Sequence, residues 1–160
     1  MERRESSPRP RVQSDLAPFL LRLSLGAGFL SAVADRFGLW GPAGTPLVAW
    51  GNYHNFVAAT AALNPWTPSI LVPALAGIAT FAEAILGVLL VIGLMTRMAA
   101  LFSGMLTLIF GMAMSAALGV HAPLTYGVFV YSAGSLILAA CTAPDKWTLD
   151  AFIAKLGRHA

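Results

Sequence analysis

Glu83 is the residue whose type and position most strongly indicate chemistry. It lies near the middle of an apolar run from about Leu71 to Gly93, and roughly 20 such residues are enough for a helix to cross a bilayer. A charged side chain at that depth costs at least about 2.5–3.5 kcal/mol on insertion scales, so it must be paired, hydrated or protonated. Because ionisable groups inside membranes usually serve a function, Glu83 is a candidate for ligand binding or proton relay.

Arg22 is the basic side chain within the first apolar run that could pair with Glu83. At 1.5 Å per residue, the two differ in depth by about 6 Å, which an arginine side chain can span. The alternative is that Arg22 snorkels to the inner headgroups, as long basic side chains often do. Pairing would keep Glu83 ionised and structural, whereas snorkelling would leave a protonated carboxyl able to exchange a proton with a bound quinol. Both interpretations stay open.

Four further polar or aromatic residues are candidates on the outer face of the membrane. His54 and His121 could bind a metal or a quinone headgroup there, although polar loop residues are the more common case. Tyr53 suits the membrane interface, and Arg36 is expected to anchor the outer end of the first run. The histidines show no helical pairing that would indicate a zinc or haem site. There is no P-loop and no dinucleotide fingerprint.

The elements that must position these residues are apolar helices. The hydrophobic fraction is 58%, the charged fraction 11% and the mean hydropathy +0.74, whereas soluble domains carry roughly 25% charged residues. Each of four apolar runs is near the length of a helical span. They cover about residues 16–37, 71–93, 98–118 and 123–142. The sequence therefore predicts an all-α integral membrane protein, a four-helix bundle over residues 15–143.

Basic residues indicate the orientation of these helices. Lys and Arg cluster before the first run, between the second and third at Arg97, and after the fourth, while residues 38–70 contain none. The positive-inside rule then places both termini in the cytoplasm of a bacterial or archaeal cell, with the chain in the cytoplasmic membrane. Residues 1–14 are expected to be a disordered cytoplasmic tail. The pI near 9.5 reflects basic flanks facing anionic lipid and requires no nucleic-acid partner.

Two short helices are predicted outside the four spans. In the outer connection, Thr45-Pro46 resembles a helix start, so we expect an interfacial or re-entrant helix over residues 46–62, ended by Asn64-Pro65. A lid over a cavity is the alternative. In the cytoplasmic tail, residues 144–160, Thr148 can cap an amphipathic helix. Its apolar face comprises Leu149, Phe152, Ile153 and Leu156. A docking helix for a soluble partner is the alternative there.

Small residues at helical spacing predict which helix faces touch, because close packing is what holds helices together in lipid. The third span carries Ser103, Thr107, Gly111, Ser115 and Gly119; the first carries Ser24, Gly28 and Ala32; the second carries Ala76, Ala79, Thr80 and Gly87. The last set shares a face with Glu83. We therefore expect Glu83 to point into the bundle.

Several stretches resemble the DoxX-like family of small membrane proteins. The first span reads LLRLSLGAGFLSAVADRFGLWG, similar to an R-L-x-L-G-x-x-F-L opening. FAEAILGVLLVIGLMTRMAAL, residues 81–101, resembles the family's acidic residue followed by G-x-x-L-x-x-G-L-x-T-R-x-A-A, and APDKWTLD resembles its G-P-G-x-[YW]-S-L-D ending. The fourth span departs from the family, because YGVFVYSAGS stands where relatives often begin with Lys-Asn or Arg-Asn.

The resemblance implies a four-helix inner-membrane bundle related to a subunit of thiosulfate:quinone oxidoreductase. It implies an accessory or quinone- or lipid-binding subunit of a membrane redox system, with redox-complex subunits as protein partners and a homo-oligomer left open. The alternatives are a small-molecule carrier or channel-like protein that uses Glu83 in a polar pathway, and a non-catalytic scaffold. Because no cofactor motif or nucleophile–base set is visible, we expect that the chain is not an enzyme by itself.

Overall fold

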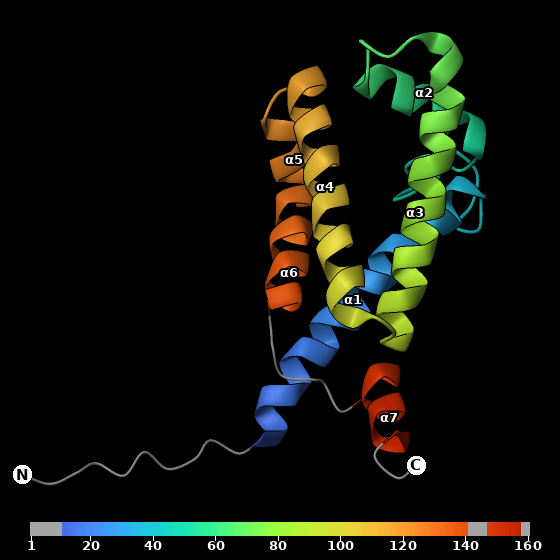
Figure 1. Ribbon diagram of the computed structural model, residues 1–160. Coiled ribbons are helices and arrows are strands. Elements are labelled where there is room, and N and C mark those ends of the chain that lie inside the picture. The colour runs from blue at the N-terminus through green and yellow to red at the C-terminus, as the bar shows by residue number, and fades with distance from the viewer. Residues whose placement is uncertain (1–10, 141–146, 158–160) are drawn as a thin grey trace, which may run out of the picture.

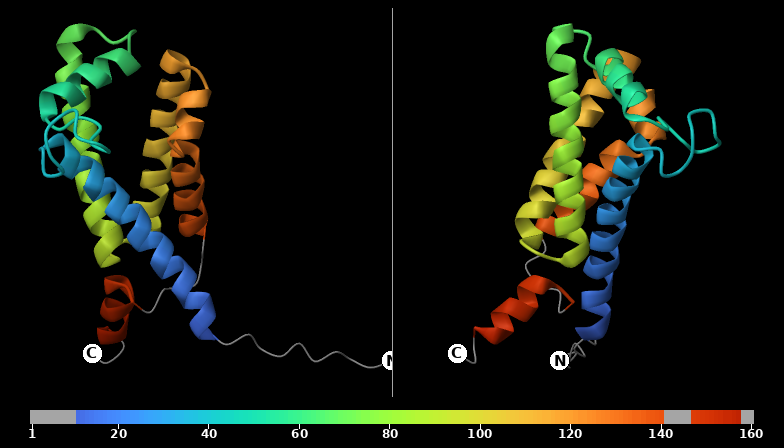
Figure 2. Two further views of the ribbon diagram at one scale, coloured as in Figure 1. Left: turned by 180° about the vertical axis from the view of Figure 1, so that it is seen from behind. Right: turned by 90° about the vertical axis from the view of Figure 1, so that its right-hand side faces the viewer.

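The computed structural model describes residues 11–140 and 147–157, with side chains from Leu16 onward. In this part of the chain all regular structure is helical (Figure 1). The long helices lie side by side, with α2 at one end of the bundle and α7 at the other (Figures 1 and 2). These are called the α2 end and the α7 end below.

Three helices are long and apolar enough to cross a membrane, namely Leu16–Arg36, Ser69–Ile92 and Thr96–Leu118. The first belongs to α1, Arg11–Arg36; the second joins the 3₁₀ turn η1, Ser69–Leu71, to α3, Val72–Ile92; the third is α4, Thr96–Leu118. The first three predicted spans are thereby confirmed as helices. Residues 11–14 also belong to α1, whereas a disordered tail was predicted there; residues 1–10 lie outside the described residues.

The fourth predicted span is not one continuous helix. It comprises α5, His121–Thr125, and α6, Val128–Ala140, separated at Gly127 by a left-handed backbone (φ 66°). α6 alone is about 20 Å long, which is short of the roughly 30 Å hydrocarbon core. The prediction of an unbroken helix over 123–142 was therefore wrong within the described residues, because an apolar run does not reveal a turn inside it.

Close approach of small residues holds the helices together in two pairs. Between α1 and α3, a Cβ added to Gly26 would lie 2.9 Å from the carbonyl oxygen of Gly87. Between α4 and α6, Ser132 Oγ donates to the carbonyl of Gly104 over 2.9 Å. The predicted contact face of α4 is confirmed at its buried positions Ser103, Thr107 and Gly111. The face predicted for α1 is confirmed at Gly28, where an added Cβ would lie 2.9 Å from the ring of Tyr131 on α6. It was wrong at Ser24, which is exposed, and it missed Gly26, which is buried.

The connection between α1 and α3 contains a shorter helix than expected. α2 is Tyr53–Leu63, and Asn52 before it is the N-cap residue, whose side chain accepts from the amide of Asn55 over 2.9 Å. The predicted start at Thr45-Pro46 was wrong, because that segment forms turns instead. The predicted stop is confirmed, since Asn64 caps the helix and Pro65 follows.

The tail helix α7, Leu149–Leu156, is confirmed with its predicted cap, because Thr148 Oγ1 accepts from the amide of Ala151. It is fixed to the turn between α3 and α4. The carboxylate of Asp150 accepts from the amides of Met95 and Thr96, each over 2.8 Å. α7 is therefore attached to the start of α4, while its apolar side chains remain exposed. These are Leu149, Phe152, Ile153 and Leu156.

Candidate functional site

A buried ion pair joins α1 to α3. One guanidinium nitrogen of Arg36, Nη2, donates to Oε2 of Glu83 over 2.6 Å, and the other, Nη1, donates to Oγ1 of Thr80 over 2.9 Å. Arg36 is 3% exposed and Glu83 is 2% exposed. Thr80 and Glu83 lie on one face of α3, so α1 presents one fork-shaped donor to two acceptors. Glu83 points into the bundle, as predicted.

The partner of Glu83 is therefore Arg36 and not Arg22. Arg22 is also buried, but its guanidinium donates to the backbone carbonyls of Leu90 and Val91 at the end of α3 and of Trp147 before α7. The carbonyls of Leu90 and Val91 are left without helical partners because α3 ends there, and a cation at that end is favoured by the helix dipole. The predicted Arg22–Glu83 pair was therefore wrong. Arg22 also does not snorkel toward lipid headgroups, because its side chain is buried in the protein.

Arg36 was expected to anchor at the membrane interface, and this expectation was also wrong. Its guanidinium carbon lies 3.7 Å from the ring centre of Phe56 and 5.2 Å from that of Trp50. Stacking of this kind stabilises an arginine by about 2 kcal/mol or more when the pair is desolvated. Both rings come from α2 and the loop before it, so Arg36 joins three parts of the chain.

Asp35 holds the loop that delivers these rings. Its carboxylate accepts from the amides of Ala49, Trp50 and Gly51 over 2.9–3.2 Å. These two adjacent residues of α1 thus contact different parts of the chain: Asp35 binds the loop and Arg36 binds α3. The sequence interpretation missed the roles of Asp35 and Phe56. A signal was available, because residues 37–82 contain no Asp, Glu, Lys or Arg, which makes Arg36 the nearest charge before Glu83 along the chain.

The remaining candidates are separated from one another. Tyr53 is half-buried and stacks against Phe37, with ring centres 6.1 Å apart, so it packs the α2 end. His121 is exposed on α5, where its ring lies 3.4 Å from the hydroxyl of Thr125. His54 is exposed on α2. Among the described residues, the two histidines join no cluster of three potential metal ligands.

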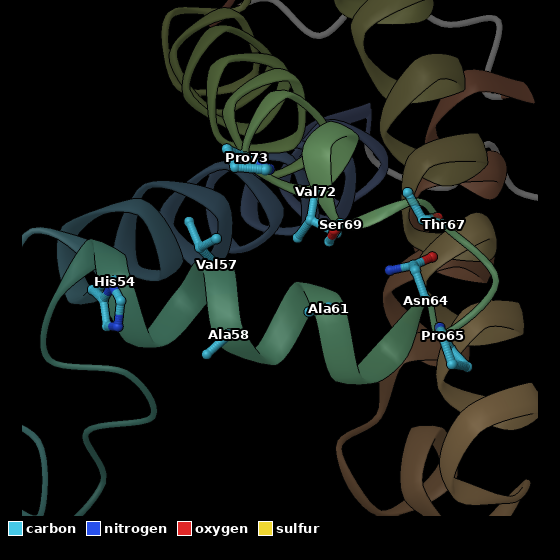
Figure 3. Close-up of a pocket in the computed structure, with 10 residues that line it drawn as sticks. All are labelled: His54, Val57, Ala58, Ala61, Asn64, Pro65, Thr67, Ser69, Val72 and Pro73. Carbon is cyan, nitrogen blue, oxygen red and sulfur yellow. The ribbon is translucent and has the colours of Figure 1, made fainter.

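His54 borders an open groove of about 290 Å³ between α2 and the start of α3. Figure 3 shows His54 at one end and Asn64, Pro65 and Thr67 at the other, with Val57, Ala58 and Ala61 between them. Val72 and Pro73 come from the α3 side of the groove. The groove thus combines apolar walls with hydrogen-bonding groups at both ends. It can accept a flat or elongated apolar molecule whose polar atoms lie at its ends.

Comparison with known proteins returned no matching family model, no matching curated protein and no matching solved structure.

Proposed function

We propose that this chain is an accessory subunit of a membrane redox system that binds a quinone or a similar lipid-like molecule in the groove between α2 and α3. The observation that carries the proposal is the groove itself, with apolar walls and polar groups at its ends. Binding sites for small molecules are mostly apolar and contain a few placed polar groups. A quinone needs this combination, because its ring is apolar and its two carbonyl oxygens accept hydrogen bonds.

The donors at the two ends suit such a ligand. The imidazole of His54 can donate from one ring nitrogen, and the hydroxyls of Thr67 and Ser69 and the amide of Asn64 lie toward the other end. The DoxX-like resemblance of the sequence supports the same class of function. It also supports a fourth membrane crossing made of α5 and α6, and the distribution of Lys and Arg supports both termini in the cytoplasm.

Glu83 has a structural role in this proposal. Its carboxylate is joined to Arg36 beneath the ring of Phe56 and is almost completely buried. This geometry favours a fixed connection between α1, α2 and α3 over a polar pathway for protons or solutes. The ion pair positions α2, and α2 forms one wall of the groove.

A pair of adjacent substitutions in α2 tests the proposal. Ala61→Phe places a ring in the groove, whereas Ala62→Phe adds the same ring at an exposed position that does not line it. Binding of short-chain ubiquinone and menaquinone analogues to the purified protein would be measured by equilibrium dialysis. We expect Ala61→Phe to weaken binding at least about tenfold, which corresponds to about 1.4 kcal/mol, and Ala62→Phe to leave it unchanged.

His54→Ala tests the donor at one end of the groove and should weaken binding by about 0.5–1.5 kcal/mol, the net contribution of one hydrogen bond. Equal binding by the wild type, Ala61→Phe and His54→Ala would place the quinone elsewhere. Absence of any binding by the wild type, together with purification free of quinone and redox proteins, would contradict the proposed function.

A further inference from the structure

α7 begins where two membrane-length helices meet. α3 ends at Ile92 and α4 begins at Thr96, and both helices are long and apolar enough to cross a membrane. The amide of Asp150 donates to the carbonyl of Gly93 over 3.1 Å, and its carboxylate binds the start of α4. A Cβ added to Gly93 would lie 2.8 Å from Thr148. The first turn of α7 is therefore held at the level where α3 and α4 leave the hydrocarbon.

Beyond this first turn, α7 leaves the bundle. All side chains from Phe152 to Leu156 are exposed, and α7 is inclined to α3 instead of continuing it (Figure 2). α7 has eight residues, whereas an isolated helix shorter than about 12–15 residues is marginal in water. Short helices in proteins are stabilised mainly by packing of their apolar face against another surface. α7 therefore needs a surface that the described residues of the bundle do not supply.

The apolar side chains of α7 share one face, because they recur at i, i+3, i+4 and i+7. They are Leu149, Phe152, Ile153 and Leu156, and the last three are more than half exposed. Asp150 lies outside this face, so its bonds to the start of α4 leave the apolar face uncovered.

Two observations identify lipid as the occupant of this face. The first is that α7 adjoins apolar side chains at the ends of the membrane-length helices. Met95, whose amide Asp150 binds, is exposed, and so are Ile92 and Met98 on either side of it. The second is charge. Arg97 and Lys155 are exposed at this end, whereas residues 37–70 and 119–127, which connect the helices at the other end, contain no Lys or Arg. Basic residues beside a membrane attract anionic headgroups.

We propose that α7 is an interfacial lipid-binding helix, whose apolar face enters the boundary between headgroups and acyl chains while Arg97 and Lys155 bind anionic headgroups. Helices of this kind bury their apolar face by about 5–10 Å. The backbone suits that position, because the amides of Ala151 and Phe152 donate to the hydroxyl and the carbonyl of Thr148 over 3.0 and 3.2 Å. The proposal does not depend on quinone binding.

Spin labels on two sides of α7 test the proposal. In a Cys141→Ser background, Leu156→Cys labels the apolar face, and Ala154→Cys, about 200° around the helix, is the matched control. Ile78→Cys, at an exposed position on α3, gives the value for hydrocarbon. Each labelled full-length protein is reconstituted into vesicles of phosphatidylcholine, with or without phosphatidylglycerol. Collisions with oxygen, which concentrates in hydrocarbon, are compared with collisions with a water-soluble nickel chelate present on both sides of the membrane.

With phosphatidylglycerol present, we expect the oxygen-to-nickel collision ratio at position 156 to be severalfold above that at position 154 and below that at position 78. In phosphatidylcholine alone, the ratio at position 156 should fall toward that at position 154. Equal ratios at the two positions in both lipids would overturn the proposal by placing α7 in water. Protection of position 156 from both reagents would overturn it as well, because a second copy of the chain would then cover the face.

A ratio at position 156 that is the same in the two lipids would overturn the binding of anionic headgroups. Ile153→Cys, labelled in the same way on the same apolar face, gives a second reading if the Leu156 variant does not fold.

Discussion

Arg36 and Glu83 form a 2.6 Å ion pair that joins the end of α1 to the middle of α3, and both side chains are almost completely buried. Two charges removed from water are stabilising only when each compensates the other. The pair also fixes how far α1 rises along α3. Because Phe56 covers the guanidinium, the position of α2 depends on the same contact.

A double-mutant cycle should detect this pair. We expect Glu83→Gln or Arg36→Met alone to lower the free energy of unfolding by about 3–5 kcal/mol, because each leaves a buried charge without its partner. The double variant should lose clearly less than the sum of the two. Unfolding in mixed micelles would measure these values. Arg22→Met is the matched control, and it should add to Glu83→Gln without coupling; coupling of Glu83 to Arg22 but not to Arg36 would contradict the described geometry.

Replacement of Asp35 should release the loop before α2. Asp35→Ala removes the acceptor of three backbone amides, each bond to a charged group being worth about 1.5–3 kcal/mol. We expect hydrogen exchange at Ala49, Trp50 and Gly51 to accelerate while the amides of α4 keep their protection. Asp35→Asn, which retains one carbonyl oxygen, should have a smaller effect. Unchanged exchange at these three amides in Asp35→Ala would show that the carboxylate does not hold the loop.

The contact between α1 and α3 should leave no room for a methyl group at Gly26. A Cβ at Gly26 would lie 2.8 Å from Cγ2 of Val91 and 2.9 Å from the carbonyl of Gly87, so Gly26→Ala should destabilise the protein by about 1–3 kcal/mol through overpacking. Gly77→Ala is the matched control. Its Cβ would find only the hydroxyl of Tyr53, at 3.6 Å, and alanine is favoured in a helix by about 1 kcal/mol. Thermal unfolding should therefore move in opposite directions for the two variants.

Asp150 should be needed to hold α7 against the bundle. Its carboxylate accepts from the amides of Met95, the N-cap residue of α4, and of Thr96, and loss of a comparable cap costs about 0.5–2 kcal/mol. We expect Asp150→Ala to increase both the hydrogen exchange of Thr96 and the protease sensitivity of the segment from Trp147 to Leu156. Lys155→Ala, an exposed change on the same helix, should alter neither. Equal protease sensitivity in the two variants would argue that other contacts attach α7.

The positions of most helices could be predicted from the amino-acid sequence. Long apolar runs with few charged residues can satisfy their backbone in a membrane only as helices, and for this reason α1, α3 and α4 could be predicted. Local chemistry was sufficient for the stop at Asn64-Pro65 and for the cap at Thr148, because these signals act within one turn. Burial of Glu83 was also readable, since the small residues that share its face mark the contact side of α3.

Only the tertiary structure shows which arginine forms the ion pair with Glu83. The expectation of Arg22 assumed that the two helices enter the membrane at the same level, so that depth could be counted from their ends. In the structure α1 is displaced along α3, and its last residue reaches the middle of α3 (Figure 2). Hydrophobic length does not encode this displacement, because sliding one apolar helix along another changes little in its contact with lipid. Two contacts select the observed position of α1 along α3. They are the close approach of Gly26 to Gly87 and the ion pair of Arg36 with Glu83.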